Sequence, residues 1–257
     1  MLRADLAVIG GTGVYKAEML ENTRDVEMET CYGKVNLLLG SYAGREVAFL
    51  ARHGKGHSVP PHLVNYRANI RALKDLGVKK IIATAAVGSL NQAMAPLDFV
   101  IIDQFLDFTK VRSSTFFDGE QEGVRHVDVT DPYCPRLRAF LYEQAVALGL
   151  KTHQGGCYAC MEGPRYETPA EIKMLKLLGG DVVGMTSVPE VVLAREAEMC
   201  YATVAMVTNY AAGIQPTKLS HQEVVDVMQQ LSENISRLIM TALAELTIDD
   251  ECACCRW

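Results

Sequence analysis

Short apolar runs alternate with longer amphipathic stretches along most of the chain, and this alternation constrains the fold more than any other feature. It is typical of an α/β domain, in which strands form a central sheet and helices pack against it. The apolar runs predict strands over residues 6–9, 35–39, 46–50, 80–85, 98–102, 152–160, 181–184 and 201–208. The amphipathic stretches predict helices over residues 63–76, 135–148, 169–178, 189–199 and 220–246.

Helix-start signals support these boundaries. Three of the five expected helices begin at a proline (Pro135, Pro169 and Pro189), which suits a first helical turn. Ser220, followed three residues later by Glu223, predicts a capping box at the start of the last helix. The 257 residues are 49% hydrophobic, enough for a large core, and no linker or repeat divides them. We therefore expect one α/β domain over residues 1–248, followed by a cysteine-rich tail over residues 249–257.

The charge distribution and the N-terminus narrow the class of partner. The formal net charge is -6 and no dense Lys/Arg run occurs, which argues against non-specific binding to nucleic acid. The first apolar run is short, is preceded by Asp5 and is followed by a glycine turn, unlike a signal peptide. No stretch reaches the roughly 18 to 20 apolar residues that span a bilayer. We expect a cytoplasmic protein that binds neither nucleic acid nor membrane.

Polar and glycine-rich segments follow most of the expected strands. In sequence order they are GGTG, RHGKGH, VGSL, EGPRYET, MTSVPE and NYAAG. In α/β sheets, ligands bind at the carboxyl ends of the strands. These segments are therefore expected to meet at one site although they are far apart in the sequence.

Three of these segments carry groups that suit an anion. Thr12 lies in a glycine turn that lacks both the third glycine of a dinucleotide fingerprint and the Gly-Lys-Ser/Thr of a Walker loop. Arg52 offers a planar fork of donors that matches phosphate oxygens, and His53 follows it directly. Thr186 and nearby backbone N–H groups open a helix, a favourable place for an anion. Because no carboxylate or cysteine accompanies the histidines around His53, we expect a phosphate-sized anion rather than a metal ion.

Two other segments suit a purine. Tyr166 can stack on the flat face of the base, and an ionised Glu167 can accept a hydrogen bond from a ring N–H. Asn209, at the end of the last strand, has both a donor and an acceptor. Two structural alternatives remain open: Glu167 helps to cap the next helix, or Asn209 is a turn residue.

The eight cysteines give no clear metal or redox motif. Cys31, Cys134 and Cys200 stand alone and are expected to be small, part-buried apolar side chains. Cys157 and Cys160 form a C-x-x-C on an expected strand, without the second pair that a zinc site needs. In the polar tail nothing is expected to bury the three cysteines, which either form a disulfide, within or between subunits, or are incidental. They are Cys252, Cys254 and Cys255.

Taken together, the segments resemble the trimeric purine nucleoside phosphorylase and methylthioadenosine phosphorylase superfamily from about residue 6 to residue 246. The resemblance rests on GGTG, RHGKGHSVPPHLVNYRANI, VGSL, PLDFVIIDQFLDFT, EGPRYET, MTSVPEVVLAREAEMCYA and TNYA. It implies a single domain with a central mixed β-sheet flanked by helices. It further implies a homotrimer, or a hexamer built as a dimer of trimers.

The resemblance also assigns roles. It implies a phosphate site formed by Thr12, Arg52, His53, Ala86 and Thr186. Met185 resembles a ribose-contacting methionine, and His126 matches a histidine that reaches into the 5′ region of a neighbouring subunit's site. Where methylthioadenosine phosphorylases tend to carry Thr, this chain has Ala85, so one hydroxyl contact with phosphate is expected to be missing.

Two positions bear on the choice of base. Methylthioadenosine phosphorylases usually carry Ser at the position of Glu167 and Asp-Tyr-Asp where this chain has Asn209-Tyr210-Ala211, whereas enzymes specific for 6-oxopurines carry Glu and Asn. An ionised Glu167 that faces the bare N1 of adenine would leave two acceptors unpaired, at a cost of about 1–3 kcal/mol. Facing the N1–H of hypoxanthine or guanine, it accepts a charge-assisted hydrogen bond. A 6-oxopurine is therefore expected.

The 5′ substituent remains open. His221, in LSHQEV, resembles a histidine that binds the 5′-hydroxyl in 6-oxopurine enzymes, yet the sequence as a whole is closer to the methylthioadenosine branch. Inosine, guanosine and 5′-methylthioinosine all remain candidate substrates. His126 and His221 together suggest that a hydroxyl is tolerated.

The sequence thus predicts a pentosyltransferase that uses inorganic phosphate as co-substrate, without metal or redox cofactor. The expected catalytic residues are Arg52 and His53, which hold phosphate below C1′, and Asn209, which stabilises charge on the leaving base. Alternatives are a methylthioadenosine phosphorylase, a nucleosidase that uses water, and a non-catalytic nucleoside-binding protein. The missing third glycine disfavours a Rossmann dehydrogenase.

Overall fold

A computed structural model of the chain describes residues 2–10, 20–119, 123–216, 218–248 and 252. Within these residues, eleven strands form one mixed sheet, which confirms the expected fold class. The strands are β1 (Leu6–Gly10), β2 (Glu21–Thr30), β3 (Gly33–Tyr42), β4 (Arg45–Ala51), β5 (Lys80–Ser89), β6 (Phe99–Ile101), β7 (Gln104–Phe108), β8 (Thr152–Gln154), β9 (Cys157–Met161), β10 (Val182–Gly184) and β11 (Cys200–Tyr210). The helices are α1 (Tyr66–Asp75), α2 (Pro135–Ala147), α3 (Pro169–Leu177), α4 (Ser187–Glu196) and α5 (His221–Glu245).

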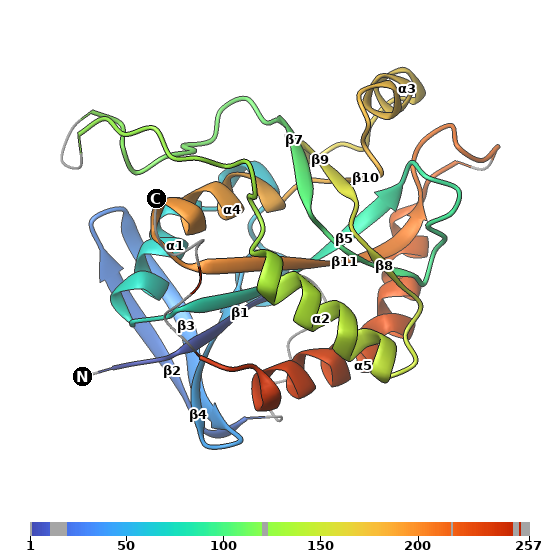
Figure 1. Cartoon of the computed structure of the whole chain (residues 1–257). Helices are drawn as coiled ribbons and strands as arrows, with labels where there is room; N and C mark the ends of the chain where they lie inside the picture. Colours follow the sequence, from blue (N-terminus) through green and yellow to red (C-terminus); the bar gives the residue numbers. More distant parts are fainter. Residues whose placement is uncertain (1, 11–19, 120–122, 217, 249–251, 253–257) are drawn as a thin grey trace.

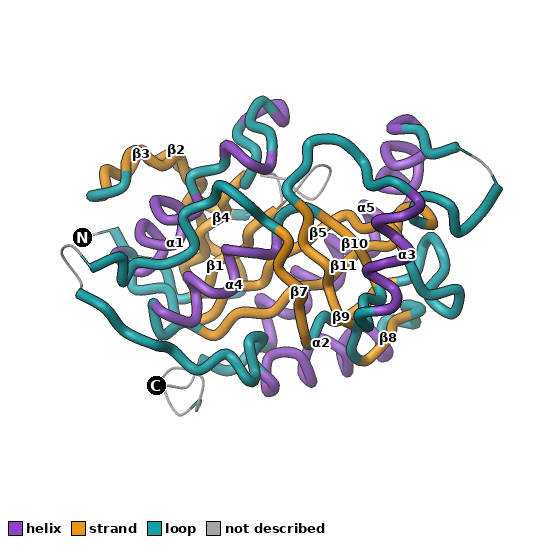
Figure 2. The backbone as a smooth tube through the Cα atoms, turned by 90° about the horizontal axis from the view of Figure 1, so that it is seen from above, coloured by secondary structure: helices purple, strands orange, loops and turns teal. Residues whose placement is uncertain are grey.

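The sheet runs in the order β2-β3-β4-β1-β5-β10-β9-β7, and it branches at β5. There β11 pairs in parallel with β5 along most of its length and then continues the sheet through β6 to β8. Helices α2 and α5 pack on one face and α1 and α4 on the other (Figures 1 and 2). The central strands are therefore covered on both sides, as their apolar sequences predict.

Alternate residues of the central strands enter two different cores. In β1, Ala7 and Ile9 pack in the cluster that contains α1 and α4, whereas Leu6 and Val8 pack in the cluster that contains α2 and α5. This is the period of two that a pleated strand imposes on its side chains. The two cores fix the sheet between two helical layers, so its strand ends form a rigid support for a site.

Three boundaries differ from the expectation. The run over residues 152–160 is two strands, because Gly155, with a φ of +106°, interrupts it beside Asp103. The VGS of VGSL is the end of β5 rather than the loop after it. Helix α4 begins at Ser187, two residues before the expected start, but Val188 has an extended backbone, so the continuous helical part starts at Pro189. Prolines do open α2 and α3, as predicted.

Two strands and one cap were not predicted. Strand β2 is an exposed edge strand rich in charged residues, and β7 has only half-buried apolar side chains, so neither gives an apolar run. Helix α3 begins with a capping box in which Thr168 and Glu171 bind each other's backbone N–H groups. At α5, the Ser220 hydroxyl accepts from the Glu223 N–H at 3.1 Å, the first half of the box expected there.

One tail residue corrects the sequence interpretation. Cys252 is 4% exposed and packs in the core cluster of α2 and α5, whereas nothing was expected to bury it. Cys254 and Cys255 lie outside the described residues. Among the helices that the structure describes, none combines the length and the apolar character needed to cross a membrane.

Candidate active site

Five of the six polar segments after the strands contribute residues to one cavity, and of the sixth, GGTG, only Gly10 is among the described residues. It is lined by residues from the end of β4, the end of β5, the β9–α3 and β10–α4 connections, the end of β11 and the start of α5. These residues are Arg52, His53, His57, Pro61, Ala85, Ala86, Val87, Gly88, Tyr166, Glu167, Val183, Gly184, Met185, Thr208, Asn209, Ala211, Leu219, His221 and Val224. The pairing of β5 with β11 sets Asn209 opposite Gly88, where a Cβ would lie 3.3 Å from the Asn209 amide nitrogen.

Arg52 is a buried cation with a fixed counterion. Its Nε and Nη2 each donate to a carboxylate oxygen of Glu190 at 2.7 Å, and its Nη1 donates to the Thr84 carbonyl at 2.9 Å. Burial alone would lower the pKa of Arg52, but the charge and hydrogen bonds of Glu190 outweigh burial and raise it. The guanidinium is therefore always charged, and Glu190 fixes its orientation at the edge of the cavity.

The first strand supplies a neighbour for Arg52. The Arg52 N–H donates to the Gly10 carbonyl at 3.1 Å, so the start of the GGTG segment lies directly beside the expected phosphate ligand. Thr12 itself lies outside the described residues. Ala86 is on the cavity surface near the end of β5.

His53 is a neutral hydrogen-bonding group rather than a second cation. Burial, and then the charge of Arg52, lower the pKa of His53 to about 4. Its Nδ1 lies 2.8 Å from the Val59 carbonyl, which can only accept, so Nδ1 carries the proton. Nε2 is therefore an acceptor, and it suits an O–H of a protonated phosphate.

Thr186 precedes α4 and is buried, but its backbone N–H is already used. That N–H donates to the Tyr158 hydroxyl at 3.2 Å, so any backbone donor for an anion here comes from the other N–H groups of the MTSVPE segment. The Thr186 side chain makes no capping hydrogen bond to α4. Thr186 is not among the residues that line the cavity, so its role as a phosphate ligand stays a prediction.

The two expected base-reading residues line the same cavity, and the interpretation of Asn209 as a turn residue is wrong. Helix α3 is capped by Thr168 and Glu171, not by Glu167, and Asn209 belongs to β11 rather than to a turn. Glu167 is 8% exposed and Asn209 is 5% exposed. Burial chiefly raises the pKa of Glu167, and the nearby charge of Glu171 adds to the effect.

Neighbouring groups orient the Asn209 amide. Its oxygen accepts from the Thr208 hydroxyl at 2.8 Å, and its nitrogen donates to the Tyr210 carbonyl at 2.9 Å. An amide nitrogen carries two N–H groups, so one donor is left for a ligand. The arrangement presents a carboxyl group and an amide N–H to a ligand in this part of the cavity.

The remaining wall mixes histidines with apolar side chains. The Tyr166 hydroxyl lies 3.4 Å from Nδ1 of His221, and Leu219 and Val224 contribute apolar surface. Met185 also lines the cavity. His126 does not: it is exposed in the long connection between β7 and α2, which runs along the outside of the molecule (Figures 1 and 2).

Sequence reasoning missed the residues that hold these loops in place. Glu190 was interpreted only as part of a helix start, although it binds Arg52 and accepts from the Tyr201 hydroxyl at 2.6 Å. Arg112, with a side chain 1% exposed, donates to the Met185 carbonyl at 2.7 Å and the Glu162 carbonyl at 2.7 Å. It thereby joins the MTSVPE and EGPRYET segments. No local pattern marks either residue, since their partners are distant in the sequence.

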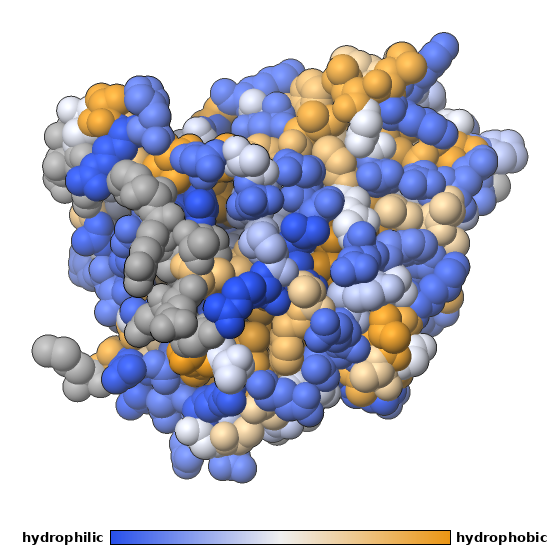
Figure 3. All heavy atoms as spheres, viewed as in Figure 1, coloured by the Kyte–Doolittle hydropathy of each residue, from blue (hydrophilic) through white to orange (hydrophobic). Residues whose placement is uncertain are grey.

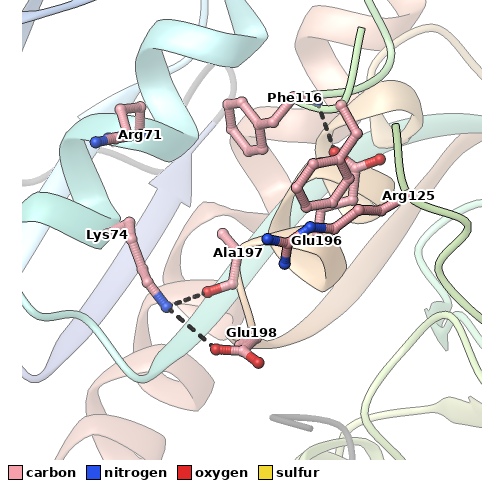
Figure 4. Close-up of a pocket in the computed structure, with 8 residues that line it drawn as sticks. Arg71, Lys74, Phe116, Arg125, Glu196, Ala197 and Glu198 are labelled. Carbon is pink, nitrogen blue, oxygen red and sulfur yellow. Dashed lines mark hydrogen bonds and ion pairs between the residues drawn. The ribbon is translucent and has the colours of Figure 1, made fainter. Parts of the chain in front are cut away.

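A second cavity lies outside this site. It is bordered by Arg71 and Lys74 of α1, by Phe116, and by residues at the end of α4 (Figure 4). Lys74 donates to the Ala197 carbonyl at 2.5 Å and lies 3.9 Å from Glu198. None of the expected site residues lines it.

Comparison with known proteins agrees with this geometry. A family model described as the phosphorylase superfamily matches residues 5–244. A probable 6-oxopurine nucleoside phosphorylase of Thermococcus kodakarensis is 58% identical, over 97% of this chain and 95% of the relative. A probable S-methyl-5′-thioinosine phosphorylase of Methanothermobacter thermautotrophicus is 49% identical, over 97% of this chain and 87% of the relative. The structure of a methylthioadenosine phosphorylase from Schistosoma mansoni in complex with adenine superposes with a TM-score of 0.91 at 32% identity, covering 96% of this chain and 93% of that one.

Proposed function

This chain belongs to the phosphorylase superfamily, and we propose that it is a purine nucleoside phosphorylase that cleaves 6-oxopurine nucleosides with inorganic phosphate. The products are the free base and ribose 1-phosphate, or its 5-methylthio analogue, so the enzyme is a pentosyltransferase. The observation that carries the proposal is a single cavity that holds a buried carboxyl group and amide together with a buried arginine and a neutral histidine.

The base specificity follows from the donors and acceptors at the cavity wall. Ionised Glu167 accepts from the N1–H of hypoxanthine or guanine, and the remaining N–H of Asn209 donates to N7 or O6. Adenine offers no N1–H to Glu167. Tyr166, beside Glu167 at the cavity wall, packs on the nucleoside. Glu167 and Asn209 together therefore support a 6-oxopurine nucleoside as substrate over methylthioadenosine.

The chemistry is a displacement at C1′ through a ribosyl cation-like transition state. Arg52, His53 and the Thr186 hydroxyl hold phosphate in line with the departing base, so a bimolecular attack becomes a local one. The C–N bond breaks and its electrons move to the purine, where the Asn209 N–H stabilises the growing charge. A phosphate oxygen then forms the new bond to C1′. The mechanism requires no metal ion or redox cofactor.

The mixed wall near His221 bears on the 5′ group. His221 and the Tyr166 hydroxyl suit a 5′-hydroxyl, whereas Leu219 and Val224 suit a methylthio group. We therefore propose that the enzyme accepts nucleosides with either a 5′-hydroxyl or a 5′-methylthio group. The relatives named above include a 6-oxopurine enzyme and an S-methyl-5′-thioinosine enzyme, which share the 6-oxo base.

We extend the proposal to a homotrimer, alone or paired as a hexamer. Exposed apolar side chains support subunit contacts: Leu177 and Leu178 at the end of α3 are 80% and 54% exposed, and apolar surface gathers over this helix (Figure 3). His126, exposed and outside its own cavity, is free to complete the 5′ region of a neighbouring site.

One assay tests the activity. Inosine, guanosine, 5′-methylthioinosine and 5′-methylthioadenosine are compared side by side, with and without phosphate. We expect phosphate-dependent release of hypoxanthine or guanine, with weak release of adenine. Cleavage that does not depend on phosphate would make the protein a nucleosidase, and binding without turnover would make it a nucleoside-binding protein.

A further inference from the structure

Three cysteines from distant parts of the chain meet in the core opposite the nucleoside cavity. Cys134 is the N-cap of α2, Cys200 is the first residue of β11, and Cys252 is in the C-terminal tail. Their sulfur atoms all lie within 4.8 Å of one another, and those of Cys134 and Cys252 are 3.5 Å apart. All three are buried. None of them lines the nucleoside cavity.

We propose that these three thiols bind one soft divalent cation of the zinc type. A tetrahedral Zn²⁺ has Zn–S bonds of about 2.3 Å, which sets two ligand sulfurs about 3.8 Å apart. The Cys134 and Cys252 sulfurs lie 3.5 Å apart and the other two separations do not exceed 4.8 Å, so small rotations of the side chains bring all three sulfurs to one ion. A water molecule or a further ligand would take the fourth position of the tetrahedron. The ligand set is all sulfur, and thiolates select soft cations over Mg²⁺ or Ca²⁺.

The start of α2 stabilises the net negative charge of the proposed metal site. Each thiol releases its proton to solvent as its sulfur bonds to the ion, so three thiolates and a divalent cation carry one net negative charge. The backbone N–H of Leu137, in the first turn of α2, donates to the Cys134 sulfur at 3.4 Å. The positive end of this 13-residue helix thus faces the anionic group.

The ion would join the tail to the part of the core that supports the phosphate site. The segment before Cys252 is held by Lys80, which donates to the Thr247 carbonyl at 2.6 Å. The residues next to Cys134 and Cys200 are Tyr133 and Tyr201, whose hydroxyls contact Ser187 and Glu190 of α4. We therefore expect the ion to act on stability and on the placement of the tail, not on the chemistry.

The test uses the full-length protein, reduced and freed of metal, and Co²⁺ as a spectroscopic probe for the zinc site. We expect about one equivalent of Co²⁺ to produce a thiolate-to-metal charge-transfer band, which Zn²⁺ then removes by displacement. Zn²⁺ retained after gel filtration should reach about one ion per chain, and the midpoint of thermal unfolding should rise when Zn²⁺ is added.

Single variants identify the ligands. Cys134→Ser, Cys200→Ser and Cys252→Ser should each lose the band and the thermal shift, whereas the matched control Cys31→Ser, at an exposed cysteine, should keep both. Cys252 lies outside the helices and strands, so Cys252→Ser remains informative if the other two variants fail to fold. Absence of the band in the reduced parent protein overturns the proposal, as does its survival in Cys252→Ser. A disulfide between two of the three, with no uptake of Co²⁺ after reduction, overturns it in favour of a redox pair.

Discussion

Glu167 shows how burial turns an ordinary carboxyl group into a sensor of the base. Its side chain is almost inaccessible to solvent at the cavity wall, and burial raises its pKa. In the proposed function only its ionised form accepts from the N1–H of a 6-oxopurine. Protonation of the Glu167 carboxylate therefore competes with binding of the substrate N1–H. Because the pKa is raised, this competition begins at a higher pH than it would for an exposed glutamate.

The first prediction follows from that competition. Because the carboxylate predominates only above its raised pKa, kcat/KM for inosine should fall as the pH is lowered through that pKa, before the range of an ordinary glutamate is reached. In Glu167→Gln this acid limb should disappear, and kcat/KM at neutral pH should drop by about 10- to 100-fold, the loss of a charge-assisted hydrogen bond. A pH profile of both proteins checks it; an unchanged acid limb in the variant would assign the limb to another group.

The second prediction concerns the other side of the base. Changing Asn209 and Ala211 to Asp, together with Glu167→Ser, should shift preference toward 6-aminopurine nucleosides, because the new carboxylates accept from the 6-amino group while the N1 acceptor no longer faces Glu167. Ala211 is 3% exposed, so its replacement also buries a charge, and thermal unfolding must be followed alongside activity. If the triple variant folds, keeps full turnover of inosine and gains no turnover of adenosine, the assignment of Glu167 and Asn209 as base-reading residues is wrong.

At the scale of elements, helix α4 is the part that sets the geometry of the anion site. It supplies Glu190, which receives two hydrogen bonds from Arg52 and one from Tyr201 in a region without solvent. A buried pair of this kind gives little net stability, but removing one partner leaves a buried charge without its counterion. The pair therefore positions Arg52 more than it strengthens the fold.

The third prediction tests that role. Glu190→Gln should destabilise the protein by about 3–5 kcal/mol and raise the KM for phosphate by about tenfold or more, since Arg52 loses its anionic anchor. The KM for inosine should change less. Glu198→Gln is the matched control, because Glu198 lies 3.9 Å from Lys74 at a half-exposed ion pair, where the expected change is below about 1 kcal/mol. Equal effects on both substrates in Glu190→Gln would mean that Glu190 only supports the fold.

The elements also show why the sequence predicts some parts and misses others. Strands such as β1 and β11 are buried on both faces, so they appear as continuous apolar runs. Edge strand β2 faces solvent and, among the described strands, pairs with β3 alone, so its sequence carries no such run. Likewise, cavity residues at strand ends were predictable from position, whereas Glu190 was not, because its contact with Arg52 spans 138 residues.

At the scale of the whole molecule, the proposed function leaves the 5′ region of the site with few groups from its own chain. The cavity wall there comes from His221 and a few apolar side chains, and the connection that carries His126 runs elsewhere on the same subunit. Thr115 and Asp118 attach the first part of that connection to α4 and α1, through Glu196 and Arg67. An assembly in which His126 meets a neighbouring cavity would complete the 5′ region there.

The last prediction separates this arrangement from a self-contained subunit. Since His126 is exposed and is not among the residues that line its own cavity, we expect His126→Ala to change the KM for nucleoside through a neighbouring chain. We expect light scattering to give a mass of three or six times 28.2 kDa, and the KM for inosine to rise about three- to tenfold, the loss of one hydrogen bond, with the KM for phosphate unchanged. Val124→Ala, at an exposed residue of the same connection, is the control and should leave both constants as they are. A monomer at assay concentration with full activity, or a normal KM for inosine in His126→Ala, would show that each subunit forms its 5′ region alone.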